Sequence, residues 1–198
     1  MRELEAEEAE FVYKFISKNL MFTEMGDHLV PNRSILATRP GMTARVLGGS
    51  LGIGGGYLGR WTEKEFDDFF REYLPNGCYL WVESAENEHG LLPLYWAPYS
   101  SERRDWLYVY GKIENGGLPC GMISVDGRLA VMAELDCNFT ILFGDPDVIS
   151  AFDIKFGGKE EICKEFKGFL NSKEVNFGQG NIYGFLNVYI PPLVGCEE

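Results

Sequence analysis

The dipeptide Asp126-Gly127 stands between two runs of residues that are typical of β-strands, Cys120–Val125 and Arg128–Leu135. Aspartate followed by glycine tolerates the positive φ angles of a type I′ turn, whose twist matches that of two paired strands. A connection this short makes the strands antiparallel, because a parallel crossover needs about a dozen residues or more. The sequence therefore predicts a β-hairpin at this point.

The same short spacing holds over residues 78–143, where strand-like runs follow one another. Runs rich in β-branched and aromatic residues favour strands, and this region has three besides the hairpin: Cys78–Glu83, Trp106–Ile113 and Asn138–Phe143. Together they predict an antiparallel meander. Further strands are expected around Ala44–Leu47 and in the C-terminal region 174–190, at Glu174–Phe177 and Asn181–Ile190.

Apolar residues at helical spacing mark the first 22 residues. One face carries the apolar side chains, and acidic residues fill the first turns, where they favour the helix dipole. We expect this helix to run from about Leu4 to Met21, with Gly26 shortly after it as the residue that prevents its continuation. Its apolar stripe packs either against a core of the same chain or against a partner; the core is the reading that we favour.

Two more helical regions have recognisable starts. In residues 62–74, Thr62 and Glu65 have the spacing of a capping box, and Pro75 ends the helix. In residues 145–170, Asp145 followed by proline predicts the N-cap of a short helix, and Lys159–Leu170 predicts a longer one. The sequence thus predicts one α+β domain over residues 1–198, with about three amphipathic helices packed on a mainly antiparallel sheet.

The charge balance narrows the classes of partner. The chain of 198 residues has 30 Asp and Glu against 18 Lys and Arg, which gives a formal net charge of −12. Such a chain repels phosphate backbones and anionic membranes, so we expect neither a nucleic acid nor a membrane as partner. The natural partner is a basic protein. The acidic N-terminus lacks the basic and apolar order of a secretory signal, and we expect a cytoplasmic protein.

A glycine-rich run, Gly48–Arg60, is the most unusual local feature. Gly54, Gly56 and Gly59 satisfy the pattern G-x-G-x-x-G, which cradles a pyrophosphate in dinucleotide-binding folds. There, however, the helix opens within the motif, whereas the helix predicted here begins after the last glycine. We therefore expect a loop, or backbone packed closely against a strand. The alternative is a phosphate-bearing ligand bound by the glycines and Arg60.

Recognisable catalytic and metal-binding patterns are missing from the sequence. Its two histidines, His28 and His89, stand in no known motif, and its five cysteines form no C-x-x-C pair. The cysteines are expected to be free thiols in a reducing compartment. We expect neither a cofactor nor a metal ion, and we favour a protein that is not an enzyme.

Aromatic residues gather between two predicted strands: Tyr95, Trp96, Tyr99 and Trp106. Aromatic side chains in a loop offer a large contact area, as recognition surfaces do. They can also cap the open end of a sheet, which is the slightly favoured reading, and both readings stay open. Asp145 and Asp147 add acidic groups to the candidate partner-binding residues.

Three classes of function remain. The one that we favour is an acidic module that sequesters or neutralises a basic protein, as the immunity protein of a bacterial toxin or effector does; the analogy rests on size, acidity and the lack of catalytic motifs. The second is an enzyme or sensor that binds a phosphate-bearing small ligand at Gly48–Arg60. The third is a structural or assembly subunit that uses its N-terminal helix.

Overall fold

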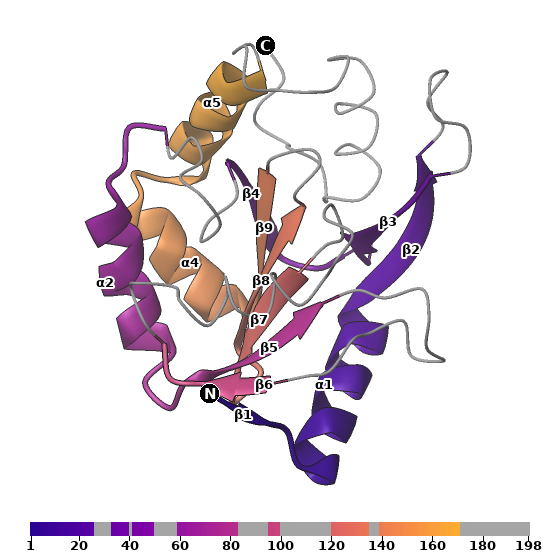
Figure 1. Cartoon of the computed structure of the whole chain (residues 1–198). Helices are drawn as coiled ribbons and strands as arrows, with labels where there is room; N and C mark the ends of the chain where they lie inside the picture. Colours follow the sequence, from indigo (N-terminus) through magenta and orange to yellow (C-terminus); the bar gives the residue numbers. More distant parts are fainter. Residues whose placement is uncertain are drawn as a thin grey trace.

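A seven-stranded antiparallel sheet lies at the centre of the molecule (Figure 1). The computed structural model describes residues 1–25, 33–39, 41–49, 59–82, 95–99, 120–134 and 139–170. The predicted α+β fold with an antiparallel sheet is confirmed. In spatial order the strands are β1 (Arg2–Glu3), β6 (Tyr95–Ala97), β5 (Cys78–Val82), β7 (Cys120–Ser124), β8 (Leu129–Glu134), β9 (Phe139–Gly144) and β4 (Ala44–Gly48).

One row of paired residues crosses all seven strands: Arg2, Trp96, Tyr79, Ile123, Ala130, Phe143 and Ala44. Because side chains alternate between the two faces of a sheet, this row fixes which residues share a face. All members except Arg2 belong to one hydrophobic cluster or pack against it.

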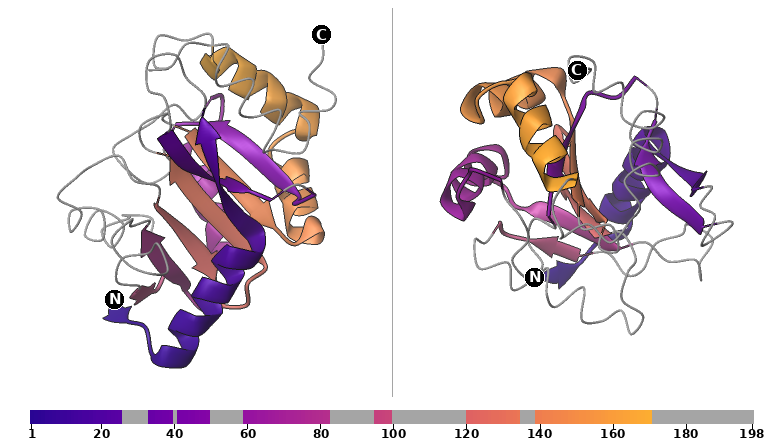
Figure 2. Two further views of the ribbon diagram at one scale, coloured as in Figure 1. Left: turned by 90° about the vertical axis from the view of Figure 1, so that its right-hand side faces the viewer. Right: turned by 90° about the horizontal axis from the view of Figure 1, so that it is seen from above.

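Helix α1 (Ala6–Asn19) covers that face and contributes Val12 and Ile16 to its core. Helices α2 (Glu63–Tyr73) and α4 (Pro146–Lys155) cover the opposite face, as the right-hand view of Figure 2 shows. Because both faces are covered, every residue of β5 and β7 is buried.

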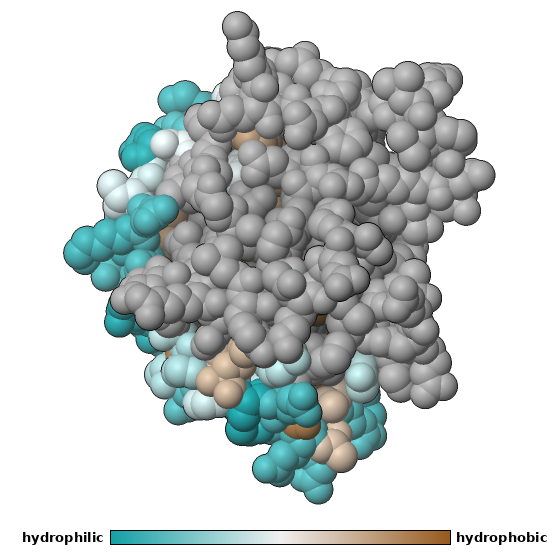
Figure 3. All heavy atoms as spheres, viewed as in Figure 1, coloured by the Kyte–Doolittle hydropathy of each residue, from teal (hydrophilic) through white to brown (hydrophobic). Residues whose placement is uncertain are grey.

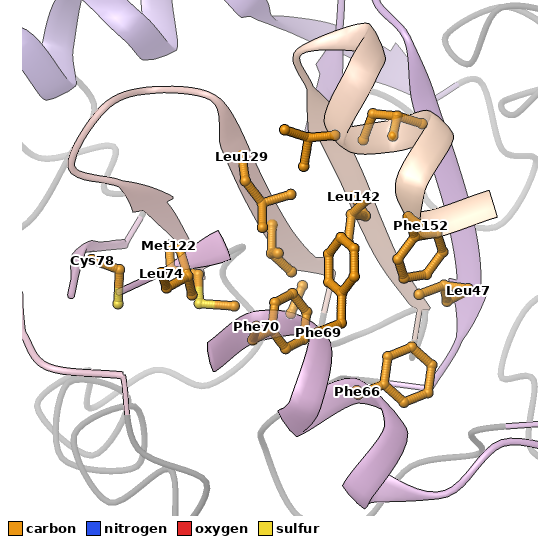
Figure 4. Close-up of a cluster of buried hydrophobic side chains, with 14 of the residues drawn as sticks. Leu47, Phe66, Phe69, Phe70, Leu74, Cys78, Met122, Leu129, Leu142 and Phe152 are labelled. Atoms are coloured by element: carbon orange, nitrogen blue, oxygen red, sulfur yellow. The ribbon is translucent and has the colours of Figure 1, made fainter. Parts of the chain in front are cut away.

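The second face holds the larger of the two hydrophobic clusters (Figure 4). Phe69 of α2 meets Phe152 of α4 edge to face, with 5.1 Å between ring centroids. Phe66 stacks on Phe156 at 4.6 Å. Edge-to-face and stacked aromatic pairs of this kind add to the gain from burial, so the two helices are joined through their phenylalanines.

Helix α5 (Lys159–Leu170) lies along β4, which ends the sheet on that side. Its bounds are those that the sequence predicts. Phe169 packs directly on the backbone of Gly48, since a Cβ atom at position 48 would stand only 2.3 Å from Phe169 Cγ. The backbone at the start of the glycine-rich run is thus closely approached, but by the side chain of a helix, whereas the sequence suggested a strand as the close neighbour.

The hairpin at Asp126-Gly127 is present, but its turn is wider than the two-residue type I′ turn that the sequence suggests. Gly127 donates to the carbonyl of Ser124 at 2.8 Å, and the paired strands resume only at Leu129. Ser124 Oγ accepts a hydrogen bond from the Leu129 amide at 2.9 Å, and Asp126 Oδ1 accepts one from the Arg128 amide at 3.1 Å. These side chains stabilise the wider turn.

The predicted extent of the N-terminal helix is wrong. The helix ends at Asn19, and Leu20–Met25 forms strand β2, which pairs with β3 (Arg33–Thr38) in a separate two-stranded sheet. Leu20 fits both the end of the helical stripe and the start of a strand, so periodicity alone placed the boundary too late.

The remaining predicted elements fall into two groups. Region 62–74 is confirmed as α2, with Thr62 Oγ1 accepting from the Glu65 amide. The predicted short helix after Asp145 is confirmed as α4, a ten-residue helix. The predicted strands Trp106–Ile113, Glu174–Phe177 and Asn181–Ile190 lie outside the described residues.

Trp81 of β5 stands opposite Gly121 of β7 in the sheet register. A Cβ atom on Gly121 would lie 2.5 Å from the Trp81 ring, so the indole occupies the space that a side chain at 121 would need. The Trp81 side chain is buried, and in the described part of the chain its indole N–H has no hydrogen-bond partner.

Candidate functional site

The aromatic residues proposed as a partner surface lie on two sides of the sheet. Tyr95 and Trp96 are neighbours on β6, so their side chains point to opposite faces. Tyr95 packs on the cluster under α2, while Trp96 packs on the cluster under α1. The two rings are half-buried and do not form one continuous patch.

Trp96 is held by two groups of its own chain, the Asn76 carbonyl and the Arg2 guanidinium. Its indole N–H donates to the carbonyl of Asn76 at 3.2 Å. The guanidinium of Arg2 lies over the ring, 5.4 Å from its centroid, and the same guanidinium donates to both carboxylate oxygens of Glu8, at 2.6 Å and 2.7 Å. One face of the Trp96 ring is therefore covered by Arg2 of the same chain and is not open to a partner protein.

Tyr99 links the end of the sheet to α2. Its hydroxyl donates to Asp67 Oδ1 at 2.6 Å, and its ring lies 5.7 Å from that of Phe70. These contacts favour the structural reading of Tyr99, the capping of the sheet end. Trp106 lies outside the described residues.

Asp145 and Asp147 lie at the start of α4. Asp145 is its N-cap, and its carboxylate accepts a hydrogen bond from the Asp147 amide at 2.9 Å. Arg128 stands 3.5 Å from the other carboxylate oxygen of Asp145. Asp145 thus has a clear role in capping the helix, whereas Asp147 is exposed in the first turn.

Carboxylates surround the described end of the glycine-rich run. Arg60 donates a hydrogen bond to Glu161 of α5 at 2.7 Å. A carboxylate oxygen of Glu165 lies 2.7 Å from the position that a Cβ atom on Gly59 would occupy. A small cavity of about 10 Å³ beside these residues has room for no more than about one water molecule. Gly54 and Gly56 lie outside the described residues.

An acidic surface lies at the beginning of the chain, around β1 and the start of α1, where Figure 3 shows hydrophilic residues gathered. Glu3, Glu5 and Glu7 are exposed there and form no ion pair with any other described residue. We call these three residues the N-terminal acidic corner. Pairing of β1 with β6 sets Glu3 opposite Tyr95 and thereby places the corner beside the aromatic residues of β6.

The acidic corner is fixed to the sheet through Glu8. Besides binding Arg2, the Glu8 carboxylate accepts a hydrogen bond from the Glu5 amide at 2.9 Å. Chiefly because of the hydrogen bond from Arg2, the pKa of Glu8 falls from 4.5 to about 2. Glu8 therefore stays ionised at any ordinary pH and holds the start of α1 against β1.

The sequence interpretation did not single out the corner as a site. It assigned the N-terminal acids to the helix dipole, a role that remains correct for Glu7 in the first turn. The signal was the excess of acid in residues 1–10. What the sequence could not supply is the pairing of a two-residue strand with β6.

The described residues offer little evidence for a metal-binding site or for a catalytic site based on cysteine or histidine. No group of three or more His, Cys, Asp or Glu side chains in this part of the chain could hold a metal ion. Three cysteines, Cys78, Cys120 and Cys163, are buried there and belong to no disulfide. Both histidines lie outside the described residues.

None of the four helices in the described part of the chain has the length and apolar character needed to cross a bilayer.

Comparison with known proteins found no match, whether with a family model, with a curated protein or with a solved structure.

Proposed function

We propose that this protein is a binding module for a basic protein partner, and that the N-terminal acidic corner is part of its contact surface. The observation that carries the proposal is the set of three exposed carboxylates, Glu3, Glu5 and Glu7, none of which forms an ion pair with another described residue. Exposed like charges steer an oppositely charged protein and discriminate among partners.

The corner is also held in place, which lowers the cost of binding. Arg2, between Glu3 and the N-terminus, is fixed by Glu8 and by the ring of Trp96. A surface that is ordered before the encounter loses less side-chain freedom on association. This favours recognition by the corner over recognition by carboxylates on an unattached tail.

In its finer form the proposal is that the partner is a toxin or effector, which this protein neutralises in the cytoplasm. The two alternative functions have less support. Arg60, the cation available for a phosphate, is paired with Glu161, with a second carboxylate beside Gly59. The buried residues of the N-terminal stripe, Val12 and Ile16, pack on this chain's own sheet.

The first experiment is co-purification with the product of the neighbouring gene, at low and at high salt. We expect capture of a protein with a basic surface at low salt and weaker capture at high salt, because salt screens exposed charges. Failure to capture it at low salt, or capture of a protein without a basic surface, would overturn the proposal.

The second experiment locates the surface on the complex. The triple variant Glu3→Gln, Glu5→Gln, Glu7→Gln should weaken calorimetric binding by about fivefold or more. The matched control is Glu63→Gln, Glu72→Gln, Glu160→Gln, which removes the same charge from exposed positions on α2 and α5. Equal losses from both triples would show that only net charge matters, and would overturn the acidic corner as the contact surface.

A further inference from the structure

A groove runs along α1, on the same face of the sheet as that helix. It has a volume of about 370 Å³, which lies within the range of sites for small molecules, roughly 300–1,000 Å³. Its walls come from α1, from the β7–β8 turn and from the residues beside β4 and β9. The residues that line it are Phe11, Lys14, Phe15, Lys18, Asn19, Met42, Asp126, Gly127 and Gly144.

The groove combines an aromatic wall with a cationic rim. Phe11 and Phe15 are one helical turn apart and half-buried, with 6.2 Å between their ring centroids. Lys14 and Lys18 follow the same spacing and are exposed. The rim is therefore locally positive in a chain whose net charge is −12.

Lys18 is the cation best able to bind a ligand. Lys14 already contacts Glu10 at 2.6 Å, whereas Lys18 has no ion pair with any residue that the structure describes. The carboxylate on the opposite wall, Asp126, accepts hydrogen bonds from the Ser124 hydroxyl and the Arg128 amide. Its charge is thus partly satisfied within its own turn.

Asn19 provides a second, independent polar group at the same end of the groove. Asn19 is only 8% exposed. Its backbone carbonyl accepts a hydrogen bond from the Arg39 amide, whereas its side chain has no hydrogen-bond partner among the described residues. Its side-chain amide lines the groove, and a ligand carboxylate there would give it a hydrogen-bond partner. Arg39 also donates two hydrogen bonds to the carbonyl of Ser17, which offsets the negative end of the helix dipole.

We propose that this groove binds a small amphipathic anion, with its flat apolar part on Phe11 and Phe15 and its carboxylate on Lys18 and Asn19. Charge complementarity selects an anion, and the size and aromatic wall of the groove select a compact, flat body. This site is separate from the N-terminal acidic corner, which attracts the opposite charge.

The probe is 2-naphthoate, with 2-naphthylmethanol as an uncharged ligand that has the same ring system. Each is titrated into the full chain and followed by backbone amide chemical shifts. We expect 2-naphthoate to shift amides of residues 11–19 and 125–128, and to bind about fivefold more tightly than the alcohol, as one exposed charge pair allows. Equal affinities, shifts confined to other regions, or no shifts at millimolar ligand would overturn the proposal.

A pair of variants tests the cation. Lys18→Gln should weaken 2-naphthoate binding by about threefold to fivefold and leave binding of the alcohol unchanged. Lys164→Gln, which removes one exposed lysine from α5, is the matched control and should leave both affinities unchanged. If Lys164→Gln weakens binding as much as Lys18→Gln, the attraction comes from overall charge and the assigned contact is wrong.

Discussion

The guanidinium of Arg45 on β4 donates two hydrogen bonds to the carboxylate of Asp153 on α4, at 2.7 Å and 2.5 Å. The two side chains are only 14% and 18% exposed. The pair joins the outermost strand on that side of the sheet to a helix more than a hundred residues further along the chain. A two-pronged ion pair of this kind is geometrically specific and is protected from solvent screening.

Substitution of Asp153 by Asn should lower the free energy of unfolding by about 2 kcal/mol, because it leaves the Arg45 charge partly buried without a counter-ion. Urea denaturation measures the loss. The control is Glu161→Gln, which removes the partner of Arg60. Because Arg60 is 56% exposed, this change should cost less than about 1 kcal/mol. Equal losses would mean that the Arg45–Asp153 pair is no stronger than a surface contact.

The ion pair between Glu8 and Arg2 predicts a dependence of stability on acid pH. Folding lowers the pKa of Glu8 from 4.5 to about 2, so the carboxylate stabilises the folded state above pH 4.5. That contribution falls as the pH drops from 4.5 to 2 and is lost below. The stability difference between wild type and Glu8→Gln should shrink over this interval when both are denatured with urea. A difference that stays constant from pH 6 to pH 2 would contradict the assignment.

The contact between Gly48 and Phe169 predicts a sharp steric limit. Gly48→Ala should lower the free energy of unfolding by about 1–3 kcal/mol, because the new methyl group overlaps the Phe169 side chain. Hydrogen exchange should then show weaker protection across α5. Gly41→Ala is the contrasting variant, since its φ of +88° strains the backbone but no atom stands within 4 Å of the added methyl. It should leave exchange in α5 unchanged.

Where a helix has a capping or periodicity signal in its own sequence, that signal was sufficient to predict the helix. Thr62 and Glu65 form the predicted cap at the start of α2, and α5 has the predicted bounds, Lys159–Leu170. The Asp126-Gly127 hairpin is also correct, because turn chemistry and strand propensity act within a few residues.

Features that depend on distant partners could not be predicted. The β2–β3 pair needs Leu20–Met25 to leave the helical pattern and pair with Arg33–Thr38. The two-residue strand β1 exists only because β6 offers an edge for it. Neither signal is present in the local sequence, since both depend on the tertiary pairing of strands.

In the candidate site, too, the local features could be predicted and the contacts with distant residues could not. The sequence identified the acidity of residues 1–10 and the aromatic residues of the segment around Tyr95. It could not show that Trp96 lies under Arg2, or that Tyr99 donates to Asp67. The contact of Arg2 with Trp96 follows from strand register, which also separates Tyr95 from Trp96 and sets the acidic corner beside β6.

The position of Trp81 over Gly121 has an evolutionary consequence. One indole fills the place of two side chains, so neither position can change alone: a larger residue at 121 collides with the ring, and a smaller residue at 81 leaves a void over bare backbone. In homologous chains with this sheet, tryptophan should therefore stand at the first position only where glycine stands at the second. Glycine at the second position should persist even without the tryptophan, because a Cβ atom there would also lie 2.4 Å from the Val131 carbonyl oxygen.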